Sequence, residues 1–66
     1  MLKKRSLLIA GHATSVTMEP EFWDALKDIA EARGQSINQL VAEIDQGRDG
    51  NLSSAIRVFV LGEYRK

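Results

Sequence analysis

The chain has 66 residues, contains no cysteine and has a formal net charge of zero, with 9 basic and 9 acidic side chains. This length allows one domain, and the lack of cysteine excludes disulfides and thiolate metal sites. No apolar run approaches the roughly 18 residues of a membrane helix, so we expect a cytoplasmic protein with no membrane partner. A core this small usually needs oligomerisation when disulfides and metals are absent, and we therefore expect a homodimer.

Charge is unevenly distributed along the chain. Residues 1–18 hold three basic side chains and no acid, whereas residues 19–50 hold eight acids against three bases. The first five residues look like a mobile arm, whose basic side chains, Lys3, Lys4 and Arg5, could contact phosphate groups. The alternative is a basic terminus that is simply solvated.

Residues 6–18 have the character of a strand. Polarity alternates in residues 14–18, which are rich in β-branched side chains, as is typical of a half-buried strand. Gly11 and His12 interrupt the pattern, which fits either one continuous strand with a bulge at Gly11 or a hairpin with Gly-His as its two-residue turn. We favour the continuous strand. A single strand leaves its backbone groups unpaired, so we expect it to pair with its copy in a second chain.

The first predicted helix covers residues 20–33. Pro20 suits the first helical position, where its missing N–H costs nothing, and Gly34 suits the left-handed residue that ends a helix. Met18 and Trp23 have the spacing of a hydrophobic staple across the helix start, which makes Trp23 a structural residue.

Two further helices follow. Ser36 and Gln39 have the spacing of a capping box, which predicts a second helix over residues 36–46. A third helix is predicted over residues 52–64, and it carries apolar side chains on more than one face. Such a helix is buried on several sides, which indicates contact with a second subunit.

Two stretches of this sequence carry a family resemblance. Residues 11–26 follow the pattern Gly-His-x-Thr-Ser-Val-x-x-Glu-Pro-x-Phe-Trp-x-x-Leu, and residues 51–57 follow Asn-Leu-Ser-Ser-Ala-x-Arg. Together with the order of strand and helices over roughly residues 13–46, these motifs resemble the ribbon-helix-helix family, and in particular short bacterial members. The resemblance implies a mostly α fold with one β-strand per chain. It also implies an intertwined homodimer with a two-stranded antiparallel ribbon, to which the third helix is an addition.

The resemblance also implies a site. The two-stranded ribbon would enter the major groove of double-stranded DNA. Alternation then directs three residues inward (Thr14, Val16 and Met18) and three towards the bases: Ala13, Ser15 and Thr17. These outward side chains are small, whereas ribbons of the family often present side chains that form bidentate pairs with bases. Phosphate contacts would come from the arm, the turn and the start of the second helix: Lys3, Lys4, Arg5, His12, Ser36 and Asn38.

Two of the candidate residues have plainer interpretations. His12 could contact a phosphate or respond to pH, but a turn residue without a special role fits as well. Arg57 could reach DNA, and we favour instead an ion pair with an acid such as Asp45 or Asp49.

The sequence thus predicts a DNA-binding protein, a bacterial transcriptional repressor or regulator acting as a homodimer. The alternative is a protein-interaction module, antitoxin-like or a dimeric scaffold, that binds a partner protein. The sequence has no glycine-rich phosphate loop, nucleophile arrangement or metal-ligand cluster. We therefore expect no enzymatic activity, no cofactor and no small-molecule substrate.

Overall fold

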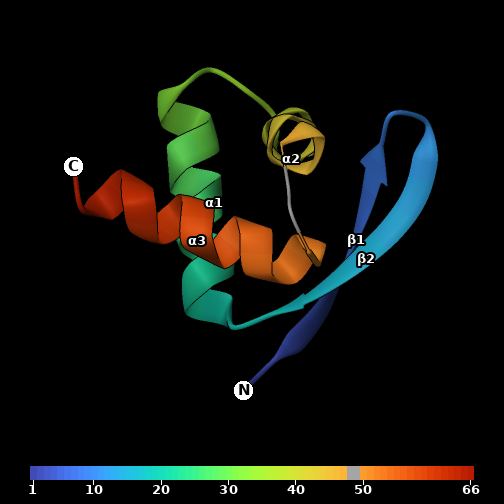
Figure 1. Cartoon of the computed structure of the whole chain (residues 1–66), viewed down its shortest axis with the longest axis horizontal. Helices are drawn as coiled ribbons and strands as arrows, with labels where there is room; N and C mark the ends of the chain where they lie inside the picture. The colour runs from blue at the N-terminus through green and yellow to red at the C-terminus, as the bar shows by residue number, and fades with distance from the viewer. Residues whose placement is uncertain (48–49) are drawn as a thin grey trace.

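The computed structural model describes residues 1–47 and 50–66, which form two strands and three helices. In chain order these are β1 (Lys3–Ile9), β2 (His12–Met18), α1 (Pro20–Ala32), α2 (Ile37–Gln46) and α3 (Leu52–Tyr64). Figure 1 shows the two strands on one side of the three helices, with α3 running across α1. No helix among the described residues is long and apolar enough to cross a membrane.

The strand region is a hairpin, so the predicted continuous strand with a bulge at Gly11 is wrong. β1 and β2 pair antiparallel, and Ile9 lies opposite His12 at the closed end. The turn is Ala10-Gly11, one residue earlier than the alternative that placed it at Gly-His. Ala10 has a φ of 51° and Gly11 a φ of 81°, and positive φ at both central residues is what a type I′ turn requires. The positive φ of Ala10 is uncommon for a residue with a Cβ, which is why the sequence pattern missed it.

The hairpin also changes the expected strand pairing. The chain has two strands among its described residues where we expected one, and β2 finds its partner in β1 of the same chain. Residues 3–5, which we expected in a mobile arm, are the first residues of β1. The ribbon is therefore built within one chain.

Local signals at the helix ends explain where the helices lie. Pro20 is the first residue of α1, and Gly34 follows the helix with a φ of 69°, the left-handed conformation predicted for it. The capping box of α2 is confirmed, because Ser36 Oγ accepts from the Gln39 N–H at 3.1 Å while Gln39 Oε1 accepts from the Ser36 N–H at 2.8 Å. At the start of α3, Asn51 Oδ1 accepts from the Ser54 N–H at 2.8 Å.

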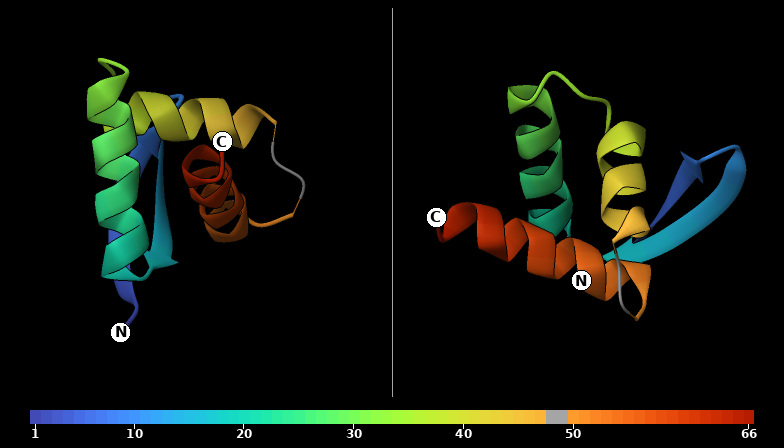
Figure 2. Two further views of the ribbon diagram at one scale, coloured as in Figure 1. Left: turned by 90° about the vertical axis from the view of Figure 1, so that its left-hand side faces the viewer. Right: turned by 45° about the horizontal axis from the view of Figure 1, so that its top comes forward.

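The core lies between the inner face of the hairpin and the three helices. Figure 2 shows α2 next to the hairpin and α3 packed across both other helices. Among the described residues the buried side chains are all hydrophobic and come from every element: Leu7, Ile9, Val16, Met18, Trp23, Leu26, Ile29, Ala30, Leu40, Val41, Ile56 and Val60. Both members of the predicted staple, Met18 and Trp23, are among them. An ion pair of 3.1 Å between Arg33 and Glu63 joins the ends of α1 and α3.

Candidate nucleic-acid interface

The outer face of the hairpin points away from the helices. Alternation buries four hydrophobic side chains of the two strands, Leu7, Ile9, Val16 and Met18, so the residues between them face outward. The strand register joins the outward residues into three cross-strand pairs: Lys4 with Thr17, Ser6 with Ser15, and Leu8 with Ala13. All six are exposed, and we call them the ribbon face.

Four of the six residues of the ribbon face are among the DNA contacts predicted from the sequence. Ala13, Ser15 and Thr17 lie along one face of β2, and Lys4 lies on β1 opposite Thr17, whereas Ser6 and Leu8 on β1 were not predicted. The unbroken apolar run from Leu7 to Ala10 hides the period of two that would have assigned these residues to faces. Only the hairpin register reveals that Ser6 and Leu8 lie opposite the predicted residues.

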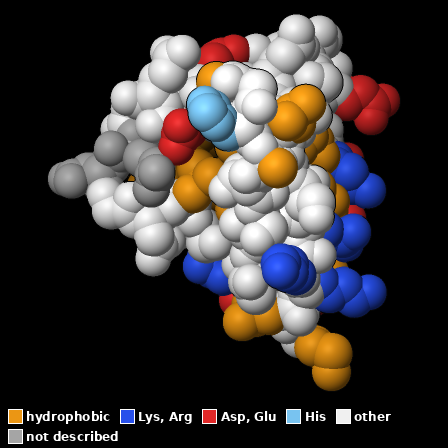
Figure 3. Space-filling model, turned by 90° about the vertical axis from the view of Figure 1, so that its right-hand side faces the viewer, with side chains coloured by type: hydrophobic (Ala, Val, Ile, Leu, Met, Phe, Trp, Pro, Cys, Tyr) orange, Lys and Arg blue, Asp and Glu red, His pale blue; other side chains and the backbone are white. Residues whose placement is uncertain are grey.

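The ribbon face changes in character along its length. Lys4 lies at its open end, the serine pair lies in the middle, and Leu8 and Ala13 lie next to the turn. Lys4 and Leu8 are separated by four residues of extended chain, which is about 13 Å. Figure 3 views the hairpin side of the molecule and shows Lys and Arg side chains along its right-hand edge and in its lower half, with hydrophobic side chains above them and at the lower end. One surface thus combines positive charge, hydroxyl groups and an apolar area.

Arg5 differs from the two lysines beside it. It lies opposite Val16, its guanidinium carbon is 5.3 Å from the centroid of the Trp23 ring, and its buried Nε has no hydrogen-bond partner. This cation–π contact holds the Arg5 side chain against Trp23 of α1. Lys3 and Lys4 are exposed, so they are better placed than Arg5 to contact a phosphate.

The start of α2 lies beside the outer edge of β1. Asn38 Oδ1 accepts a hydrogen bond of 3.3 Å from the backbone N–H of Leu8, which ties the helix N-terminus to the ribbon near the hairpin turn. The capping box uses the N–H groups of Ser36 and Gln39. In a helix start of this kind, the N–H groups of Ile37 and Asn38 remain available for an anion, and the helix dipole favours negative charge there.

Arg57 lies at the opposite edge, where α3 meets β2. Its Nε donates to Glu19 Oε1 at 2.9 Å and its Nη2 donates to the Thr17 carbonyl at 3.4 Å. The expected ion pair therefore forms, but with Glu19; of the two acids we had named, Asp49 lies outside the described residues. A hydrogen bond from its own backbone N–H, together with the one from Arg57, lowers the pKa of Glu19.

His12 closes the hairpin opposite Ile9 and is exposed. It lines a shallow hollow together with Ala13, Asp45 and Leu52. This position lies at the turn end of the ribbon face. A phosphate contact from His12 stays a prediction.

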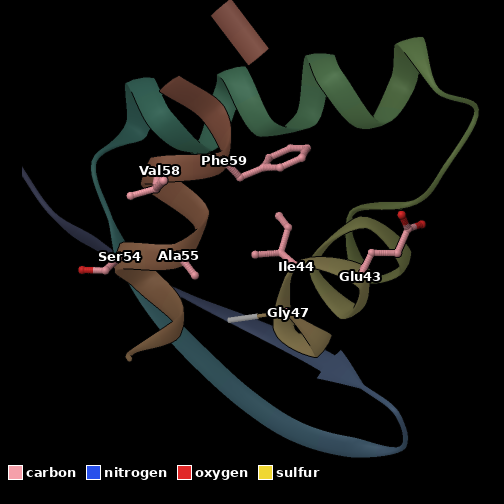
Figure 4. A pocket seen from close by; sticks show the side chains of 7 residues that line it. All are labelled: Glu43, Ile44, Gly47, Ser54, Ala55, Val58 and Phe59. Atoms are coloured by element: carbon pink, nitrogen blue, oxygen red, sulfur yellow. The ribbon is translucent and has the colours of Figure 1, made fainter. Parts of the chain in front are cut away.

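A separate apolar surface lies on the helices. An open groove between α2 and α3 is lined by Glu43, Ile44, Gly47, Ser54, Ala55, Val58 and Phe59. Figure 4 shows the side chains of Ile44 and Phe59 on the two sides of the space between the helices. On the same side, α3 exposes 69% of Val58, which also lines the groove, and 53% of Leu61. Both are apolar side chains of the helix that we expected to contact a second subunit.

In the described part of the chain, no three His, Cys, Asp or Glu side chains are grouped so that they could hold a metal ion.

Comparison with known protein families matches the chain to the ribbon-helix-helix domain over residues 2–64. The chain belongs to this family. Its members are commonly DNA-binding regulators and usually bind DNA as dimers. The comparison with curated proteins and the comparison with solved structures each return no match.

Proposed function

We propose that this ribbon-helix-helix protein is a bacterial transcriptional regulator, a repressor that binds double-stranded DNA as a homodimer in the cytoplasm. The observation that carries the proposal is the ribbon face: an exposed, partly basic surface on a two-stranded antiparallel ribbon. A major groove about 12 Å wide admits such a ribbon. Membership of a family of DNA-binding regulators supports the same function.

Most of the affinity in this mechanism comes from the phosphate backbone. Lys3 and Lys4 neutralise phosphates beside the groove and release counterions. The N–H groups at the start of α2 bind a further phosphate, and the hydrogen bond between Asn38 and Leu8 fixes this helix end relative to the ribbon. Phosphate contacts of this kind set the position of the ribbon on the duplex.

Sequence preference comes from the ribbon face and from DNA shape. Ser15 and Thr17 each offer a hydroxyl that can donate to or accept from a base edge. Their short side chains cannot form the bidentate pairs made by Arg, Asn or Gln, so part of the selectivity comes from the deformability of the site.

The homodimer explains the apolar surface of α3. A second copy that covers Val58 and Leu61 would remove two large exposed hydrophobic side chains from water. Each protomer would bring its own hairpin, because β1 already occupies one edge of β2. Two ribbons related by a two-fold axis would prefer a DNA site with two-fold symmetry.

The test is fluorescence anisotropy of the full chain with a labelled mixed-sequence duplex, titrated at low and at physiological salt. We expect binding that weakens steeply as salt rises. No binding at low salt would exclude the DNA function. The apolar groove between α2 and α3 would then favour the second candidate function, a dimeric module that binds a partner protein.

A further inference from the structure

The turn end of the ribbon face is apolar. Leu8 is 57% exposed and lies directly opposite Ala13, which is also exposed. The backbone N–H of Leu8 donates to Asn38 and so points away from β2. The pair is therefore of the non-hydrogen-bonded type, in which facing side chains lie closest.

These two side chains have no donor or acceptor. Against a guanine or a cytosine edge they would cover polar groups without pairing them, which is unfavourable. The major groove offers only one apolar group in unmodified DNA, the 5-methyl group of thymine. An apolar pair on a ribbon in this groove thus discriminates in favour of that methyl group.

We propose that Leu8 and Ala13 form a contact site for the 5-methyl groups of pyrimidines, so that the protein prefers thymine under the turn end of its ribbon. This inference rests on the proposed function, because it assumes that the ribbon face enters the major groove. It adds the chemical class of the recognised group and two residues that set specificity. The Asn38 hydrogen bond to Leu8 keeps the pair next to the phosphate site at the start of α2.

The experiment compares duplexes that differ only in the methyl group. The first pair is an alternating adenine–thymine duplex and the same duplex with deoxyuridine in place of thymine. The second pair is an alternating guanine–cytosine duplex with and without 5-methylation of cytosine. We expect the methylated member of each pair to bind more tightly, by about fourfold for each methyl group buried.

Two variants assign the effect to the ribbon. Leu8→Ser keeps the backbone hydrogen bond to Asn38 and should abolish the preference for methylated duplexes. Leu2→Ser changes a leucine of similar exposure that lies outside β1 and β2 and should retain it. Circular dichroism of both variants checks that the fold is kept.

The outcomes separate the inference from the proposed function. Salt-sensitive binding with equal affinity for both members of each pair would overturn the methyl contact and leave DNA binding intact. A preference that survives in Leu8→Ser would overturn the assignment to Leu8. Absence of binding to every duplex at low salt would overturn both proposals.

Discussion

Lys4 is the charged residue of the ribbon face. It is exposed and lies opposite Thr17. The neighbouring Arg5 instead contacts the ring of Trp23 in α1. Deleting residues 1–5 would therefore remove part of β1 as well as three charges. Single substitutions test the phosphate contact without damaging the strand.

Lys4→Ala should weaken DNA binding at low salt and reduce the magnitude of the slope of log affinity against log salt by about 1.8, the value for two phosphate contacts, one from each protomer of the dimer. Lys27→Ala is the matched control, because it removes the same charge from α1, where Lys27 pairs with Asp24. Anisotropy titrations over a range of salt concentrations measure both slopes. Equal slopes in Lys4→Ala and in the wild type would contradict a phosphate contact by Lys4.

The ion pair between Glu19 and Arg57 predicts a pH dependence of stability. The pKa of Glu19 is lower in the folded chain, through its own backbone N–H and Arg57, than in the unfolded chain. The pair therefore stabilises the fold above the unfolded-state pKa of the carboxyl, and this contribution is lost as the pH falls through the folded-state pKa.

We expect acidification to lower the free energy of unfolding less in Glu19→Gln than in the wild type, as measured by denaturant titration at neutral and acid pH. Glu21→Gln, which changes an exposed carboxyl in the first turn of the same helix, should behave like the wild type. A Glu19→Gln variant with the full acid dependence of the wild type would show that the pair does not carry the effect.

At the scale of elements, the hairpin turn holds a non-glycine residue in an unfavourable backbone conformation. Ala10 has a φ of 51°, and the left-handed conformation costs a residue with a Cβ about 1–2 kcal/mol. Asparagine adopts this conformation more readily, and Asn-Gly is a preferred type I′ turn.

Ala10→Asn should thus raise the free energy of unfolding by about 1 kcal/mol, measured by denaturant titration. Ala13→Asn makes the same chemical change within β2 and should give no gain, because asparagine is depleted in strands. A stability of Ala10→Asn at or below that of the wild type would show that the turn is not strained at this residue.

The same turn marks the limit of prediction from this sequence. Signals that act within a few residues, such as the Ser36–Gln39 capping box and the left-handed Gly34, predict features that the structure has. The hairpin turn combines Gly11 with an alanine in an unfavourable conformation, and the sequence pattern had paired Gly11 with His12 instead. The partner of Arg57 depends on how α3 packs against β2, which no local pattern encodes.

At the scale of the whole molecule, the exposed apolar side chains of α3 predict association. Leu61→Glu should shift the protein from dimer to monomer in sedimentation velocity, because a carboxylate would be desolvated at the interface. Leu8→Glu is the control, since it changes a leucine of similar exposure on the ribbon face and should leave the dimer intact. A wild-type chain that sediments as a monomer would contradict the proposed dimer.

The pairing of β1 with β2 inside one chain has a genetic consequence. A protomer with a damaged ribbon face would still assemble with an intact one, and the mixed dimer would keep one complete ribbon of undamaged sequence. When both forms are produced in one cell, partial repression from mixed dimers is expected. In a ribbon shared between two chains, every mixed dimer would instead contain one damaged strand in its single ribbon, so no mixed dimer would keep a complete undamaged ribbon.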